Sequence, residues 1–406
     1  MMYRAYAAFG LLVVIAACSA SGAVEEPKPN PDDNSRIDAA ASESDAGAPD
    51  DASATIDLDA ERPLVCGDAG FCETRLPRSD LGLPLSLRSV WVVGAKDVWS
   101  VTLEGFVLHY DGTSWTTAYK ANHELYAVWA TPSSVWVGGE AGLLFHRSAA
   151  GEWSRVEVGH SAPIRSIYGT GESDVWFTSH GGSVDHFDGT ALTHHSLDIP
   201  GLQITTIFGR TGYGTYAAGH VKTNLPNDDQ MVDFTLYHLP DQPFIFELST
   251  AKMSTFSTAL TDKRGFVPVS AVVTDSPNED QRIFMVGYEH SKLLGNGSIV
   301  NHYTNMKYCS FGAESPVSFS DLYVELRVSV EPEAVARGFP ILAYAWNDIR
   351  TMSLPGALFR WNGATVTTES LAMGYDFVPG AIFGAHSHGG DAWIVGDGFA
   401  VKGATP

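Results

Sequence analysis

The sequence predicts an all-β fold, a seven-bladed β-propeller made of four-stranded antiparallel sheets. One observation is a repeat with a period of about 38 to 40 residues, most regular in the first half of the chain. Another is that each copy contains four short runs rich in Val, Ile, Trp and Tyr, separated by Gly, Asp and Ser. The third run, as in "FVLHY", is apolar at nearly every position, which is typical of a sheet packed on both faces. Radially packed sheets satisfy all three observations.

Three copies of the repeat align closely along their whole length. They are "LRSVWVVGAKDVWSVTLEGFVLHYDGTSW" (87–115), "LYAVWATPSSVWVGGEAGLLFHRSAAGEW" (125–153) and "IRSIYGTGESDVWFTSHGGSVDHFDGTAL" (164–192). A fourth begins at 204, and three longer or divergent copies follow, one over 269–311, one containing "GALFRWNG" (356–363) and one over 380–403. The count is seven, with six or eight as alternatives because the later copies are stretched.

The last copy ends after its third strand, which would leave that strand with an unpaired edge. In the early copies the fourth strand precedes the next first-strand aromatic residue by 14 or 15 residues. The same spacing before Trp91 indicates "ETRLPR" (73–78) as an outer strand that closes the ring. Pro77 is tolerable there because an outer edge strand does not need every backbone donor.

The N-terminus carries an export signal. Arg4 precedes the apolar run "AYAAFGLLVVIAA", which is too short to span a bilayer and ends at Cys18. The stretch "IAAC" (15–18) resembles the lipobox of bacterial lipoproteins, which implies cleavage after residue 17 and lipidation of Cys18. Ser19 in the next position implies the outer membrane of a Gram-negative bacterium. An ordinary secreted protein is the alternative.

An acidic segment follows the signal. Residues 19–63 contain twelve acidic and three basic side chains and almost no large apolar residue, so we expect a disordered, extended tether. The predicted division is therefore 1–17 signal peptide, 18–63 tether and 64–406 propeller. The whole chain has 47 acidic against 25 basic residues and a net charge of -22, which excludes nucleic acid as a partner.

The remaining cysteines suit an oxidising compartment. Cys66 and Cys72 enclose the short loop "GDAGF", so we expect a disulfide between them. Cys309 is left over and is interpreted as a free, buried thiol.

The turn in "HYDGTSW" (109–115) resembles a variant of the Asp-box (BNR) repeat of sialidase-type propellers and of photosystem II assembly factor-like propellers. The lipobox, acidic tether and propeller together are similar to surface lipoproteins of myxobacteria. Asp111 directly precedes Gly112, which departs from the Asp-box spacing, so sialidase chemistry is not expected to carry over. Sialidase chemistry would also need three inner-strand arginines, and only Arg88 and Arg165 are well placed.

Most aromatic and histidine residues fall in repeat columns and are interpreted as packing between blades. The columns contain eight of the ten tryptophans, and Trp361 falls in the column of Tyr110. His109, His146 and His186 share one column of the third strand, where we expect a ring nitrogen to bond a neighbouring loop or turn.

Metal sites remain alternatives to ordinary polar loops, and no resident cofactor is predicted. His386, His388 and Asp391 in "HSHGGD" have spacing that could ligate zinc or nickel from a loop. The acidic pairs around Asp228 and Glu279 could bind calcium, although no known calcium-loop spacing is present.

Function is expected where the repeat is interrupted. Enlarged connections between second and third strands occur at about 220–232, 289–297 and 347–356, with a long segment at 249–268, all on one face and in one sector. The candidate binding residues there are His220, Asn227, Asp228, Asp229, Glu289, His290, Asn347 and Arg350. We expect a monomeric, membrane-tethered interaction module that binds an envelope protein or glycan. The alternative is an enzyme acting on an extracellular polysaccharide, a glycoside hydrolase or lyase, at the central channel.

Overall fold

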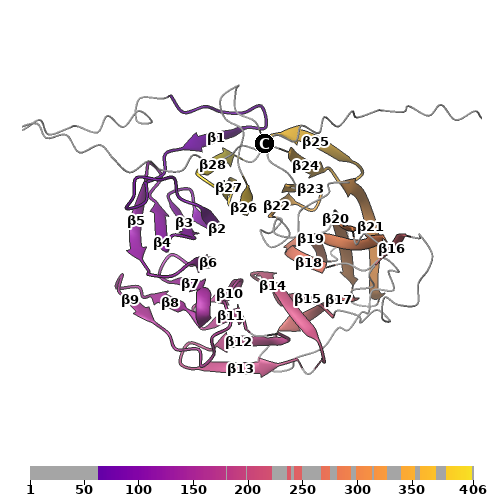
Figure 1. Ribbon diagram of the computed structural model, residues 1–406, viewed down its shortest axis with the longest axis horizontal. Helices are drawn as coiled ribbons and strands as arrows, with labels where there is room; N and C mark the ends of the chain where they lie inside the picture. The colour runs from indigo at the N-terminus through magenta and orange to yellow at the C-terminus, as the bar shows by residue number, and fades with distance from the viewer. Residues whose placement is uncertain are drawn as a thin grey trace, which may run out of the picture. The chain divides into compact units, whose positions relative to one another are not determined.

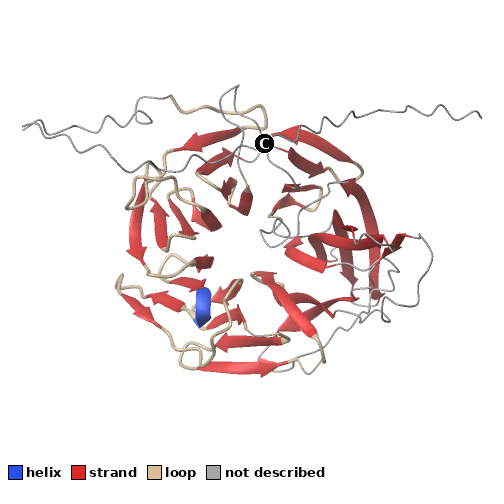
Figure 2. Ribbon diagram, in the orientation of Figure 1, coloured by secondary structure: helices blue, strands red, loops and turns tan. Residues whose placement is uncertain are grey.

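The computed structural model describes residues 63–404, apart from 180, 198, 222–235, 239–241, 249–266, 275–280, 294–298, 313–314, 327–339, 353–356 and 372–380. These residues form antiparallel sheets arranged around a common centre (Figure 1). One 3-10 turn, η1 (Glu140–Gly142), is the only helical element in the described ranges (Figure 2). The predicted all-β class is therefore confirmed.

The first three sheets follow the chain in order, with each strand paired to the next. Sheet one comprises β2 (Leu87–Gly94), β3 (Asp97–Thr102), β4 (Phe106–Tyr110) and β5 (Trp115–Lys120). Sheet two comprises β6 (Leu125–Ala130), β7 (Val135–Gly139), β8 (Leu144–Arg147) and β9 (Trp153–Arg155). Sheet three comprises β10 (Ile167–Gly171), β11 (Asp174–Thr178), β12 (Ser183–Phe187) and β13 (Leu192–Ser196).

The middle sheets are less regular. Sheet four comprises β14 (Leu202–Arg210), β15 (Gly214–Val221) and β17 (Gln242–Leu248). Sheet five comprises β18 (Val267–Thr274), β19 (Gln281–Leu293), β20 (Ile299–Gly312), β21 (Ser315–Leu326) and β16 (Leu236–His238). Because β16 pairs with the far end of β19, the chain from sheet four contributes a strand to sheet five.

The last two sheets return to four strands. Sheet six comprises β22 (Ile341–Ala345), β23 (Asp348–Met352), β24 (Ala357–Trp361) and β25 (Val366–Ser370). Sheet seven comprises β26 (Ile382–His388), β27 (Asp391–Gly396), β28 (Phe399–Ala404) and, from the other end of the chain, β1 (Phe71–Thr74).

The innermost strands form the ring. Strands β2, β6, β10, β14, β18, β22 and β26 each contact the next, and β26 contacts β2. Buried apolar side chains fill the space between successive sheets: one cluster joins Trp136 of sheet two to Phe177 of sheet three, and another joins Tyr110 of sheet one to Trp393 of sheet seven. The packing supports the interpretation of these columns as contacts between sheets rather than an aromatic binding surface.

Strand β1 pairs antiparallel with β28, Phe71 opposite Gly403 and Thr74 opposite Ala400. It begins two residues before the sequence-predicted segment 73–78 and ends four residues earlier. Phe71 explains the shift, since its side chain is fully buried in the core of sheets six and seven. Thr74 also accepts a hydrogen bond from Trp115 Nε1 at 3.0 Å, which ties β1 to sheet one.

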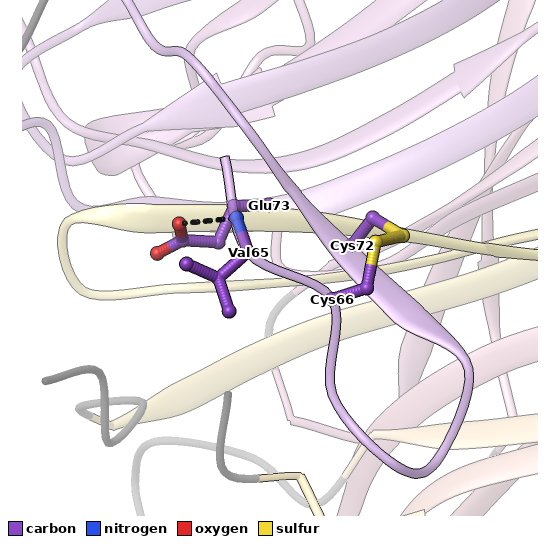
Figure 3. Close-up of a disulfide and its surroundings, with 4 residues drawn as sticks. All are labelled: Val65, Cys66, Cys72 and Glu73. Atoms are coloured by element: carbon purple, nitrogen blue, oxygen red, sulfur yellow. Dashed lines mark hydrogen bonds between the residues drawn. A yellow bond between two sulfur atoms is a disulfide. The ribbon is translucent and has the colours of Figure 1, made fainter. Parts of the chain in front are cut away.

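A disulfide joins Cys72 of this strand to Cys66 in the segment before it (Figure 3). Glu73 N donates to the Val65 carbonyl, and Val65 N donates to the Glu73 carboxylate at 3.3 Å. The segment before β1 is thereby folded back against the strand.

Tight turns between third and fourth strands recur in sheets one, three and six. Asp188 Oδ1 accepts hydrogen bonds from Thr190 N, Thr190 Oγ1 and Ala191 N, each at 2.8 Å. Asp111 and Asn362 make the equivalent turns. These bonds satisfy the turn backbone in the manner of an Asx-turn, and Gly189 follows with φ +94°.

Aromatic rings occupy the inner part of the ring near sheets one to three. Trp91 stacks on His386 with ring centroids 3.9 Å apart, and it contacts Tyr168, two sheets away, at 6.1 Å. Its Nε1 donates to the Ala130 carbonyl at 2.9 Å. The Trp91 side chain of sheet one therefore contacts both sheet two and sheet three.

Candidate interaction surface

One face of the ring carries the connections between second and third strands and those from a fourth strand to the next sheet. Its described connections include 103–105, 121–124 and 140–143 around sheets one and two, and 156–166 between sheets two and three. Candidate binding groups on this face occur at two neighbouring places, one between sheets one and two and the other between sheets two and three.

The first is an open pocket of about 330 Å³ between sheets one and two. It is lined by Leu103, Glu104, Lys120, Ala121, Asn122, His123, Glu124 and Glu140. Glycine allows two connections to approach closely next to the lining residues Glu104 and Ala121: a Cβ on Gly105 would lie 2.4 Å from the Ala121 carbonyl oxygen. The φ of Gly105 is +87°, so both the space and the backbone conformation require glycine.

Hydrogen bonds orient the pocket's carboxylates. Both oxygens of Glu104 accept from Ser86 N at 3.1 Å. Glu124 accepts from the Tyr126 hydroxyl at 2.7 Å, and burial together with this bond raises the pKa of Tyr126 to about 12. His123 Nδ1 lies 3.7 Å from the exposed Glu140 carboxylate. The lining thus holds three carboxylates, which favour a cationic ligand group.

The second is a buried carboxylate between sheets two and three. Asp185 is 1% exposed and receives His160 Nε2 and His194 Nδ1, both at 2.8 Å. Ala162 N donates to His160 Nδ1 at 3.2 Å, so the proton of the neutral His160 ring lies on Nε2 and is donated to Asp185. His194 is 55% exposed, with its Nε2 not used in the contact with Asp185.

This arrangement joins a connection to a strand. His160 belongs to the segment between β9 and β10, whereas Asp185 and His194 belong to β12 and β13. The buried acid holds both imidazole rings in place through these two hydrogen bonds. The cluster therefore holds the connection against sheet three rather than forming a recognisable catalytic site.

The residues predicted from the interrupted repeats are dispersed by the structure. Asn227, Asp228 and Asp229 lie outside the described residues. His220 is a buried residue of β15 rather than part of a loop. Glu289 and its neighbour His290 both lie in β19, which continues as a strand to Leu293. The predicted loop at 289–297 is therefore wrong up to residue 293, because β19 and β20 extend beyond β18 as a paired hairpin.

Arg350 and Asn347 also differ from their predicted positions. Arg350 is 5% exposed in β23, where Asp348 accepts from its Nε at 3.2 Å. Asp348 also receives Arg360 through two hydrogen bonds of 2.8 and 2.9 Å, so the three side chains form a structural ion cluster. Asn347 lies in the turn from β22 to β23, at the opposite ends of the strands from the predicted face. The second strand of this copy, β23, lies later in the chain than the predicted loop at 347–356 implies.

The proposed metal ligands do not converge. His386 lies in β26, and its Nδ1 accepts from Val92 N at 2.9 Å. His388 is the last residue of that strand, and Asp391 in β27 pairs with Lys402 Nζ at 3.1 Å. Within the described ranges, no group of three or more His, Cys, Asp or Glu side chains is placed to hold a metal ion. His386 occupies the first-strand position equivalent to Trp91, so it belongs to the strand and not to a loop. The predicted loop is therefore only the Gly389-Gly390 turn.

The third-strand histidines are held by side-chain hydrogen bonds, but the partner of His109 is the first residue of strand β3 rather than part of a loop or turn. His109 Nε2 lies 2.9 Å from Asp97 Oδ1, and His146 Nε2 lies 2.9 Å from Ser134 Oγ. Neither the Asp185 cluster nor the pocket at sheets one and two was predicted from the sequence. Asp185 lies in the middle of strand β12, and only the pairing of β12 with β13 places it opposite His194.

Cys18 and the predicted signal and tether lie outside the described residues. Cys309 lies in β20, opposite Ile283 and Phe319. No helix in the described part of the chain is long and apolar enough to cross a membrane.

No protein-family model and no curated protein sequence matches the chain. Solved structures are similar in fold. YCF48 bound to D1 peptide shares 13% identity at a TM-score of 0.55, covering 85% of this chain and 98% of that one. YCF48 from Cyanidioschyzon merolae shares 13% identity at 0.52, covering 82% and 99%. The WD40 repeats of RRP9 share 9% identity at 0.52, covering 85% and 100%. At these identities the likeness shows a β-propeller fold.

Proposed function

We propose that this chain is a lipid-anchored, seven-bladed β-propeller of the cell envelope that binds a protein partner. The observation that carries this proposal is the open pocket between sheets one and two, on the face formed by the inter-sheet connections. Rigid sheets with variable connections on one face are a common scaffold for binding. The YCF48 structure with a bound D1 peptide supports the proposal, since a propeller of similar fold is a peptide-binding protein there.

The anchoring part of the proposal rests on the sequence. The lipobox at Cys18 would attach the chain to the outer membrane of a Gram-negative bacterium, and the acidic segment 19–63 would hold the propeller away from the surface. The seven described sheets and the pairing of β1 with β28 support seven blades with an N-terminal closing strand.

The polysaccharide enzyme is less well supported. Trp91 reaches Tyr168 across sheet two, so aromatic packing occupies that part of the centre where a channel site would lie.

The test is crosslinking capture from envelope membranes with three forms of the full chain: unaltered, Cys18→Ala, and Glu124→Gln combined with Glu140→Gln. A further form replaces 222–235 and 294–298 by short Gly-Ser connections and leaves β15 and β19 intact. We expect one protein to be captured by the first two forms and lost from a form altered on the binding face. Capture of only glycan, or of nothing by a folded chain, contradicts the proposal.

A further inference from the structure

A short turn between β1 and β2 is ordered by its own hydrogen bonds. Ser79 N donates to the Leu83 carbonyl at 2.9 Å, and Gly82 N donates to the Ser79 carbonyl at 2.8 Å. Leu83 N donates to Ser79 Oγ at 3.0 Å, and Arg78 Nη1 donates to the Gly82 carbonyl at 2.9 Å. Gly82 has φ +72°, the conformation that closes such a turn. Residues 79–83 are called the leucine turn below.

The leucine turn displays apolar side chains to solvent. Leu81 is 84% exposed and Leu83 is 58% exposed. In the described part of the chain, the large apolar side chains recorded as exposed are these two and Leu64. A single exposed leucine is ordinary, but two on one ordered turn form a small apolar protrusion. Since the turn is already ordered, little conformational entropy would be lost when it inserts into a partner.

The leucine turn adjoins the pocket. Asp80, beside Leu81, lies 4.0 Å from Lys120 Nζ, and Lys120 lines the pocket. Leu103 N donates to the Ser86 carbonyl at 3.0 Å, which joins the segment after the turn to the pocket wall. The apolar protrusion and the carboxylate-lined pocket therefore form one continuous surface.

The charge of this surface is acidic. Lys120 is engaged by the Glu104 carbonyl and lies 3.5 Å from the centre of the Phe106 ring, and Arg78 is engaged by the Gly82 carbonyl. The carboxylates outnumber these cations, and those of Asp80 and Glu140 are well exposed. A basic partner surface complements this charge, whereas the negative surface of an anionic membrane is repelled by it.

We propose that the leucine turn and the adjoining pocket form the docking site for a protein partner that presents an apolar cleft rimmed by lysine or arginine. The leucines fill the cleft, and a basic side chain of the partner enters the pocket among Glu104, Glu124 and Glu140. This inference rests on the proposed function and names its site and partner class. Buried apolar anchors surrounded by polar contacts are the usual source of affinity in such interfaces.

The test uses the unaltered full chain and synthetic peptides as probes. One peptide alternates leucine and lysine, a second alternates leucine and glutamate, and a third replaces leucine by serine while keeping lysine. We expect the leucine-lysine peptide to bind, and the affinity to fall at least about tenfold in the Leu81→Ser plus Leu83→Ser form. Leu64→Ser is the matched control and leaves the affinity unchanged. Asp80→Asn plus Glu140→Gln reduces the dependence of affinity on salt.

Several outcomes overturn the docking site. These are no binding of the leucine-lysine peptide, equal binding of the serine-lysine peptide, or equal affinity in the Leu81→Ser plus Leu83→Ser form with an unchanged melting temperature. Binding to phosphatidylglycerol vesicles that depends on Leu81 assigns the turn to a membrane instead. Leucine-dependent dimerisation in sedimentation assigns it to a second copy of the chain. If envelope capture persists in the leucine-turn variant, only the docking site is wrong and the proposed function stands.

Discussion

The Asp174 carboxylate accepts a hydrogen bond from Trp176 Nε1 over 2.8 Å, two residues along the same strand. The same oxygen lies 2.8 Å from His186 Nε2 on the neighbouring strand, and this bond is the main reason that the pKa of Asp174 is lowered. Sheet one repeats the arrangement with Asp97, whose Oδ1 lies 2.7 Å from Trp99 Nε1. An acid at the start of a second strand thus fixes the side chains that pack between sheets.

Asp174→Ala is expected to destabilise the protein by about 2 to 4 kcal/mol, because the buried Trp176 and His186 lose their hydrogen-bond acceptor. Ser134→Ala is the matched control. Ser134 bonds only His146 in the equivalent cluster, and Trp136 Nε1 has no partner among the described residues. We expect the control to cost about 1 kcal/mol in urea unfolding. Equal losses for the two variants would show that the acid has no special role.

Gly189→Ala is expected to destabilise the turn between β12 and β13 by about 1 to 3 kcal/mol. The φ of Gly189 is +94°, and an added Cβ would lie 2.7 Å from Ser173 Cβ. Gly171→Ala is the control, because no atom lies within 4 Å of its added Cβ and its φ is not positive. Thermal unfolding should separate them. An unchanged melting temperature for Gly189→Ala would contradict the turn geometry.

Phe71→Ala is expected to cost about 3 to 5 kcal/mol, since it removes a fully buried ring from the core between sheets six and seven. Leu64→Ala, at a half-exposed position seven residues earlier, should change stability by less than about 0.5 kcal/mol. Deleting residues 64–80 should lower the melting temperature further, because β28 would lose its partner strand. Retention of the full melting temperature would show that β1 does not stabilise the ring.

Stability should fall as the pH is lowered from about 6.5 toward 4. Burial, with a smaller effect of His388, lowers the pKa of His386 to about 3, and protonating Nδ1 would break its bond from Val92 N. The unfolded chain takes up this proton below its ordinary pKa of about 6.5, whereas the folded chain does not, so folding is disfavoured as the pH falls. The slope of the unfolding free energy against pH is below about 1.4 kcal/mol per pH unit, since the His386 imidazole keeps some exposed surface.

His386→Gln is the variant that tests this pH dependence, because its amide oxygen can accept from Val92 N without titrating. The slope between pH 6.5 and 4 should decrease but not vanish, since burial also lowers the pKa of His146 and His195. Asp111 and Asp188, with pKa values of about 2, act in a separate window, losing their contribution only as the pH falls below about 4. An unchanged slope in His386→Gln would rule out His386 as a source.

The repeat columns predicted some of the side-chain contacts between sheets and missed others. The columns led by Trp99, Trp136 and Trp176 predicted their packing between sheets, since a residue repeated once per copy faces the same environment each time. Arg350 broke the pattern. It occupies the position of Trp99, opposite Arg360 where Trp99 faces His109, and an ion cluster replaces the aromatic pair. A count of apolar residues could not recognise that equivalence.

The sequence by itself determined the all-β class, the repeat, and the residues that fill the sheet interfaces, because these depend on local periodicity and apolar spacing. Only the tertiary structure decided which residues meet across the chain. Pairing of β1 with β28 brings Phe71 opposite Gly403, and pairing of β12 with β13 brings Asp185 opposite His194. The exposure of Leu81 beside the carboxylate-lined pocket has the same origin. Such contacts depend on register and ring closure, which connect positions that local sequence does not relate.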